Sequence, residues 1–140
     1  MNAPDDPESG GGQEERIRAL ERKANQALSD AELLLENGSR EAAINRAYYA
    51  VFQAAQAALL TEGEDPKTHS GVIRRFGYHF IRTERVDEQI GGVLTTAQSM
   101  RGRADYDAFS NFTQGEAKNL TEDARQFVRA VRAKILPHRE

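Results

Sequence analysis

The sequence predicts an all-α protein, an up-and-down antiparallel bundle of four long helices with one shorter helix inserted. Over four long stretches, apolar residues recur at three- and four-residue steps, the spacing that places side chains on one face of a helix. No stretch shows the strict alternation of apolar and polar residues that is typical of strands. The stretch 42–60 is rich in alanine, has neither Gly nor Pro, and carries one charge, Arg46. A helix that is apolar nearly all round is usually covered on several sides, so we expect this one at the centre.

The N-terminal half predicts a tail and a helical hairpin. Residues 1–12 hold two prolines, a run of three glycines and several acids, and we expect a disordered tail there, followed by one domain over 13–140. The first helix is expected from about residue 13 to 36, and Gly38 suits a left-handed helix end. Ser39 is expected to cap the next helix, at 42–60. The short connection predicts that the two helices are antiparallel.

Two further helices and one short helix follow. A turn around Pro66 ends the central helix, and Thr68 or Ser70 is expected to cap the short third helix. The fourth helix is expected from about residue 87 to 102, with a loop after it. Thr113 and Glu116 form a capping-box pattern at the start of the last helix, which is expected to stop before Pro137.

Composition excludes several classes of protein. With no Cys there is neither a disulfide framework nor a thiolate metal site, and we expect neither a metal nor a cofactor. No apolar run is long enough to cross a membrane, and the start lacks a basic-then-apolar signal, so we expect a cytoplasmic protein without a membrane partner. The net charge is −3, but arginines gather in the middle of the chain. These arginines predict either a surface patch that binds phosphates or ordinary solvated helix surfaces.

Three short segments carry a family resemblance. They are NRAYYAVF at 45–52, KTHSGV at 67–72, and Arg101-x-x-Ala104-Asp105-Tyr106. In this order and spacing they resemble the HEPN domain (higher eukaryotes and prokaryotes nucleotide-binding), in its small stand-alone prokaryotic branch with RAYYA, THSG and ADY motifs. The resemblance covers nearly all of the chain after the tail. It implies an α-helical bundle that commonly dimerises and is often encoded beside a minimal nucleotidyltransferase in toxin–antitoxin pairs.

The resemblance implies a function that is stated here as an expectation. We expect a homodimeric HEPN module of a two-gene, toxin–antitoxin-like system, without catalysis of its own. It would bind a nucleotide, an RNA phosphate or a minimal nucleotidyltransferase partner. Many HEPN proteins are metal-independent ribonucleases, so a ribonuclease toxin is the alternative. A helical interaction domain with no ligand is the third reading.

The late motif departs from the pattern of the family's nucleases. Those carry an Arg and then a His a few residues later, whereas no His follows Arg101 here, and ionised Asp105 would repel a phosphate. A ribonuclease would therefore need Arg101 or Arg103 together with His69 from another segment. Two other pairs fit the spacing but lie outside the motif position: Arg74 with His79, and Arg132 with His138.

The candidate ligand-binding residues follow from the same motifs. They are Arg46, Tyr49, Arg101, Arg103, Asp105 and Tyr106. Arg46 and Asp105 are most simply a structural ion pair, since a buried guanidinium needs a carboxylate. The alternative is a phosphate-binding cleft lined by Arg46, Arg101 and Arg103.

The tyrosines and His69 have predicted roles of their own. Tyr48 and Tyr49 are helix neighbours and point about 100° apart. We therefore expect at least one of them in the core, with its hydroxyl hydrogen bonded. His69 is expected to cap its helix or bond the turn, with proton transfer as the alternative. In related toxins a partner adenylylates a tyrosine at the position of Tyr106. The resemblance thus makes Tyr106 a candidate modification site, and the alternative is a packed loop anchor.

Overall fold

The computed structural model of the protein describes residues 11–137, and these residues form helices and turns without a strand. The elements are α1 (Gly11–Glu36), α2 (Arg40–Leu60), α3 (His69–Phe76), a π-helical turn η1 (Gly77–Ile81), α4 (Glu88–Tyr106) and α5 (Gln114–Lys134). The prediction of an all-α bundle with four long helices and a short one is confirmed.

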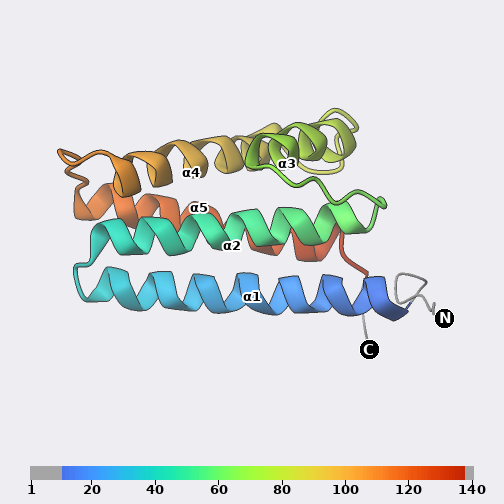
Figure 1. Ribbon diagram of the computed structural model, residues 1–140, viewed down its shortest axis with the longest axis horizontal. Helices are drawn as coiled ribbons and strands as arrows, with labels where there is room; N and C mark the ends of the chain where they lie inside the picture. The colour runs from blue at the N-terminus through green and yellow to red at the C-terminus, as the bar shows by residue number, and fades with distance from the viewer. Residues whose placement is uncertain (1–10, 138–140) are drawn as a thin grey trace.

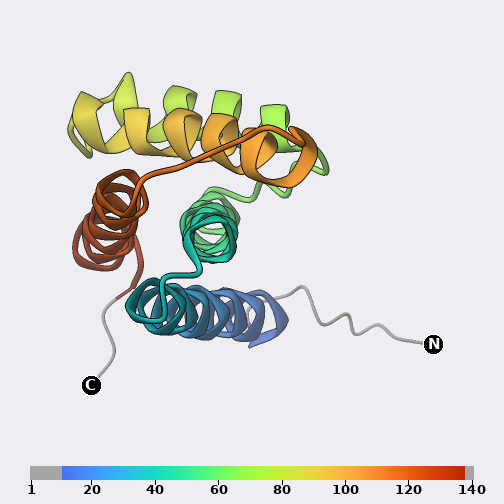
Figure 2. The same ribbon diagram turned by 90° about the vertical axis from the view of Figure 1, so that its left-hand side faces the viewer.

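Helix α2 is the centre of the bundle, as its composition predicted. It packs against α1, α3, α4 and α5. Figure 1 shows α1 and α2 side by side, with α5 behind them and the α3–α4 layer above. In the end-on view of Figure 2, α2 lies between α1 and the α3–α4 layer, with α5 at its side. This position explains why α2 carries so few charges, since a charge would lose its hydration on nearly every face.

The core combines small residues on α2 with large side chains from the surrounding helices. Along α2, small fully buried residues let neighbouring backbones come close: Ala43, Ala47, Ala50, Ala55, Ala57 and Ala58. Phe76, Phe80 and Phe127 are almost completely buried, and their rings contact one another across α3, η1 and α5. Burial of this apolar surface, at roughly 25 cal/mol per Å², is the main term that holds the helices together.

Local end signals place most helix boundaries. Gly38 adopts a φ of 76°, the left-handed conformation predicted for the end of α1. The Thr68 side chain accepts a hydrogen bond from the Gly71 amide at 2.9 Å, and Thr113 and Glu116 form the complete capping box of α5. Ser39 precedes α2 as predicted, but its side chain makes no capping hydrogen bond, so that part of the prediction is wrong.

Two boundaries differ from the prediction. Helix α1 begins at Gly11, so the last two residues of the expected tail are helical, while residues 1–10 lie outside the described residues. Helix α4 was expected to end near residue 102 but continues to Tyr106. Within this extra turn Arg101 and Asp105 form an ion pair one helical turn apart, which favours helix over loop. The expected loop residues 103–106 are therefore helical.

The short third helix also changes its winding. After Phe76 the chain passes into η1, where hydrogen bonds span five residues, such as that from the Arg82 amide to the Gly77 carbonyl at 2.9 Å. Such π-turns are rare and occur mostly as single turns within α-helices. Within residues 11–137, no helix has both the length and the apolar character that a membrane span requires.

Candidate functional site

The three sequence motifs meet around Arg101. This residue lies on the last turns of α4, opposite the tyrosines of α2. Its guanidinium carbon is 5.3 Å from the centre of the Tyr48 ring and 5.8 Å from those of Tyr49 and Tyr106. The electron-rich faces of aromatic rings attract a cation at such distances. Three tyrosines from two helices thus surround one guanidinium.

Two polar partners hold the Arg101 side chain, which is 17% exposed. The Arg101 Nε lies 3.1 Å from Asp105 Oδ2, and the two groups form an ion pair, although the N–H is not aligned for a hydrogen bond. The Arg101 Nη2 donates a hydrogen bond to the Tyr49 hydroxyl at 3.4 Å. Burial works against the charged form, but Tyr49, Asp105 and Tyr106 together raise the pKa of Arg101. Arg101 is therefore a permanent cation in a defined position.

Arg46 and Asp105 do not form the predicted ion pair. Arg46 is half-buried rather than buried, and its Nε and Nη2 donate to Asn45 Oδ1 at 3.2 and 3.0 Å. Asn45 Nδ2 donates in turn to Asp105 Oδ2 at 3.2 Å. The Asp105 carboxylate is paired with Arg101 one turn away on its own helix, so its charge is balanced without Arg46. Arg46 lies over the Tyr49 ring, with its guanidinium carbon 4.8 Å from the ring centre.

Asn45 is the site residue that the motif contained but that sequence reasoning did not select. Its amide links Arg46 on α2 to Asp105 on α4. The available signal was its place directly before Arg46, because an Asn on a helix that is otherwise apolar must find polar partners. We call the group of Asn45, Arg46, Tyr49, Arg101 and Asp105 the arginine cluster.

His69 joins the edge of the arginine cluster instead of capping α3. Its Nδ1 lies 2.7 Å from the hydroxyl of Tyr48, which is 1% exposed. Burial raises the pKa of Tyr48 well above its usual range, so the phenol keeps its proton and shares a hydrogen bond with Nδ1. Thr68 is the residue that caps α3, so the predicted capping role of His69 is wrong. The prediction that one of the adjacent tyrosines is a core residue with a bonded hydroxyl is confirmed.

Burial and a neighbouring charge keep His69 neutral. Removal of the ring from water lowers the pKa of His69, and the positive charge of Arg101 lowers it further. The structure thus places a neutral imidazole beside a permanent cation, although the two residues are far apart in the sequence.

Arg103 lies outside the arginine cluster. It is exposed, and its guanidinium carbon is 4.6 Å from the centre of the Phe112 ring. It lines a surface hollow of about 740 Å³ together with Tyr106 and polar residues of α4. A cleft lined by Arg46, Arg101 and Arg103 together is therefore not formed. Tyr106 is on the last turn of α4 and 77% exposed, so it is not a packed loop anchor.

The other Arg–His pairs give no second site. His79 Nε2 lies 2.5 Å from Glu64 Oε2, and Arg75 donates to the same carboxylate. Hydrogen bonds from Arg75 and His79 lower the pKa of Glu64 to about 2. His79 is thus engaged in an ion network, while His138 lies outside the described residues. Nowhere in residues 11–137 do three or more His, Asp or Glu side chains gather as a metal site would require.

The arginine cluster has the chemistry of an anion site with aromatic walls. A guanidinium binds phosphate through charge and hydrogen bonds, and tyrosine faces stack against planar groups. Asp105 partly neutralises Arg101, so an incoming anion competes with a carboxylate for the same cation.

Comparisons with known proteins agree on one family. The model of the HEPN domain matches residues 17–134. A protein of Methanocaldococcus jannaschii that carries the name putative toxin is 40% identical over 114 residues, which cover 81% of this chain and 84% of that protein. A UPF0332 protein of Pyrococcus horikoshii is 50% identical over 72 residues, 51% of each chain.

A solved structure has the same fold. The crystal structure of TT1696 from Thermus thermophilus superposes with a TM-score of 0.74 at 21% identity, covering 86% of this chain and 98% of the other. At this identity the likeness establishes the architecture of the helices and no more.

Proposed function

Since the chain belongs to the HEPN domain family, we propose that it is the HEPN module of a two-gene, toxin–antitoxin-like system and binds phosphate at the arginine cluster. The phosphate would belong to a nucleotide or an RNA. The observation that carries the proposal is Arg101, a cation held between three tyrosine rings and one carboxylate. The name of the M. jannaschii relative supports the toxin–antitoxin setting.

Binding at the cluster is tested with a matched pair of variants. Arg101→Ala and Arg103→Ala remove the same charge from the same helix, but only Arg101 belongs to the arginine cluster. We expect Arg101→Ala to weaken binding of a labelled single-stranded RNA or of AMP at least tenfold, and Arg103→Ala to change it less than threefold. Fluorescence anisotropy at fixed salt measures both, with circular dichroism as the check of folding. Equal losses of affinity in the two variants would show that the ligand is held only by nonspecific attraction to positive charge.

The proposed partners are a second copy of the chain and a minimal nucleotidyltransferase, in the cytoplasm. Support comes from two exposed aromatic side chains where α4 ends: Tyr106 is 77% exposed and Phe109 is 93% exposed. Large exposed aromatic residues are enriched in protein interfaces. Sedimentation velocity is expected to show a dimer that Phe109→Ser weakens, and a monomer at all concentrations would contradict this part of the proposal.

Tyr106 is proposed as a site of adenylylation by that partner. Its exposure allows the phenol oxygen to attack the α-phosphorus of ATP, with pyrophosphate as the leaving group and the phenol proton passing to a base of the transferase. Incubation with ATP and the cognate transferase is expected to add one AMP to the wild type and none to Tyr106→Phe, as read by intact mass. An adduct of equal yield on the variant would assign the modification elsewhere.

A ribonuclease is the second candidate, and the position of His69 favours it. When Nδ1 of His69 carries the ring proton and donates it to the Tyr48 hydroxyl, Nε2 is free to take the proton of an RNA 2′-hydroxyl as that oxygen attacks the adjacent phosphorus. The imidazolium then returns this proton to the leaving 5′-oxygen, and the products are a 2′,3′-cyclic phosphate and a 5′-hydroxyl. Arg101 would stabilise the charge on the phosphoryl oxygens.

Cleavage of RNA in EDTA distinguishes the two candidates. Wild type, Arg101→Ala and His69→Ala are compared on one labelled RNA. Loss of cleavage in both variants would make the protein a metal-independent ribonuclease. If the wild type cleaves nothing at any concentration, the binding module stands as proposed.

A further inference from the structure

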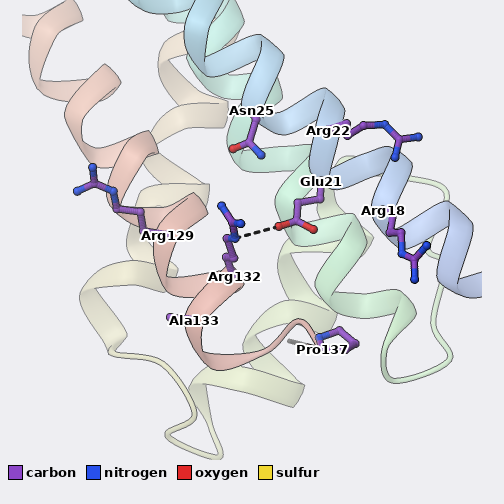
Figure 3. Close-up of a pocket in the computed structure, with 8 residues that line it drawn as sticks. All are labelled: Arg18, Glu21, Arg22, Asn25, Arg129, Arg132, Ala133 and Pro137. Carbon is purple, nitrogen blue, oxygen red and sulfur yellow. Dashed lines mark ion pairs between the residues drawn. The ribbon is translucent and has the colours of Figure 1, made fainter. Parts of the chain in front are cut away.

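A basic groove lies between α1 and α5, away from the arginine cluster. Figure 3 shows its lining, which comes from one face of α1 and from the end of α5. The groove has a volume of about 700 Å³, within the range of small-molecule sites. It lies toward the end of the bundle where α1 begins and α5 ends, whereas Arg101 lies near the opposite end, where α4 ends (Figure 1).

Four arginines and one carboxylate line this groove. They are Arg18 and Arg22 on α1 and Arg129 and Arg132 on α5, and the carboxylate is Glu21. In Figure 3, Arg132 reaches across to Glu21, whereas Arg18, Arg22 and Arg129 extend outward from the two helices. The concentration of positive charge is notable in a protein whose net charge is −3.

Two of the four guanidinium groups have no partner among residues 11–137. Arg18 pairs with Glu14 at 3.3 Å, and Arg132 Nε lies 3.5 Å from Glu21 Oε2. Arg22 and Arg129 are exposed, and neither forms an ion pair with a described residue. Like charges that are gathered on neighbouring helices repel one another, so this arrangement lowers stability unless an anion binds.

The residues that line the α1–α5 groove indicate the chemical class of ligand that it would bind. Arginine presents a planar fork of donors that binds phosphate oxygens in pairs, better than the point charge of lysine does. Because cations stand on both walls, a ligand with several phosphate groups contacts both at once. Ala133 and Pro137 add apolar surface, and Asn25 adds an amide that can donate or accept.

We propose that the α1–α5 groove binds a small molecule that carries two or more phosphate groups. On binding, the ligand neutralises Arg22 and Arg129 and draws Arg132 partly away from Glu21. The site uses none of the residues of the arginine cluster, so its existence does not depend on the function proposed above.

Tripolyphosphate is a suitable probe for this site. Isothermal titration calorimetry at low ionic strength compares it with orthophosphate for the wild type and for R22Q/R129Q. The matched control is R40Q/R74Q, which removes the same charge from exposed positions on α2 and α3. We expect tripolyphosphate to bind the wild type at least tenfold more tightly than R22Q/R129Q, a difference of about 1.4 kcal/mol. The control double variant is expected to stay within twofold of the wild type.

Nuclear magnetic resonance locates the bound probe. The amide signals of Asn25 and Ala133 are expected to shift when tripolyphosphate is added to the wild type and to stay in place when it is added to R22Q/R129Q. The proposal is overturned if the wild type does not bind tripolyphosphate, or if R40Q/R74Q loses as much affinity as R22Q/R129Q. Equal affinity for orthophosphate would also overturn it, because a single phosphate would then suffice.

Discussion

At the scale of single residues, Asn45 decides how the charges of the site are arranged. It accepts from Arg46 and donates to Asp105, so the two charged residues are linked through an amide rather than by direct contact. Asp105 is thereby free to pair with Arg101. An amide is both donor and acceptor, which neither a carboxylate nor an ammonium can be. The guanidinium of Arg101 consequently faces the tyrosines with its charge only partly neutralised.

His69 gives the protein a pH dependence of known direction. Burial and the charge of Arg101 hold the pKa of His69 below its usual value of 6.5, so the folded protein binds this proton less well than the unfolded chain. Above pH 6.5, His69 therefore does not reduce the free energy of unfolding. As the pH is lowered from 6.5 toward the pKa of His69 in the folded state, the free energy of unfolding falls. Urea unfolding between pH 7.5 and 5 is expected to show this loss, and its slope should decrease in His69→Gln.

The imidazole signals of His69 provide the direct check. Their titration midpoint in the folded protein is expected below that of a free histidine. A midpoint at or above 6.5 would contradict the burial of the ring and the proximity of Arg101.

At the scale of helices, capping chemistry separates two positions that look alike in the sequence. Thr113 and Ser39 are both hydroxyl residues directly before a helix, but only Thr113 makes the capping hydrogen bond. Thr113→Ala is expected to lower the free energy of unfolding by about 1 kcal/mol. Ser39→Ala is expected to change it by no more than a few tenths. Urea denaturation of the two variants measures the difference, and equal losses would contradict the assignment of caps.

Two adjacent glycines in α4 make a second comparison. A Cβ added at Gly91 would lie 2.7 Å from Cδ1 and 2.8 Å from Cγ1 of Ile81, whereas one added at Gly92 meets nothing within 4 Å. Gly92→Ala is expected to raise the free energy of unfolding by about 0.5–1 kcal/mol, because Ala loses less backbone entropy in a helix. Gly91→Ala is expected to lower it, since Ile81 must leave its position.

Thermal or urea unfolding of the two variants distinguishes the steric effect of a Cβ against Ile81 from the higher helix propensity of alanine. If Gly91→Ala stabilised the protein as much as Gly92→Ala, the close contact between α4 and η1 would be absent in solution.

At the scale of the whole molecule, the buried phenylalanines join the α3–α4 layer to the rest. Phe127 of α5 is fully buried against Phe76 of α3, with 5.3 Å between their ring centres. Phe127→Ala is expected to cost about 3–5 kcal/mol, a large share of a typical domain's stability. Phe127→Leu, which leaves a smaller cavity, is expected to cost less than about 1.5 kcal/mol.

An exposed phenylalanine is the matched control. Phe109 is 93% exposed in the single chain, so at protein concentrations where the chain is monomeric Phe109→Ala is expected to leave the free energy of unfolding within about 0.5 kcal/mol of the wild type. Chemical denaturation of the three variants at such a concentration tests the expected order of losses, which rises from Phe109→Ala through Phe127→Leu to Phe127→Ala. A large loss at Phe109 in the monomer would contradict its exposure.

The sequence by itself determined the class of fold, the central helix and most helix ends. These are local properties, since the spacing of apolar residues defines a helical face and a Gly, Thr or Pro at the right position ends or begins a helix. The three motifs also lie on helices that the structure brings together around Arg101. The sequence predicts the end of α4 one turn too early, because a glycine such as Gly102 is typical of a helix end, whereas the ion pair of Arg101 and Asp105 extends this helix to Tyr106.

Only the tertiary structure decided which residues meet. In place of the predicted pair of Arg46 and Asp105, Arg46 contacts Asn45 and Asp105 contacts Arg101. His69 lies against Tyr48, and Arg103 lies apart from Arg101. The tertiary structure also brought together the arginines of α1 and α5, which are about a hundred residues apart in the chain. The physical reason is that hydrogen bonds and ion pairs act over a few ångströms. Which of several possible partners lies that close depends on how the helices pack, and the order of residues along one helix does not contain that information.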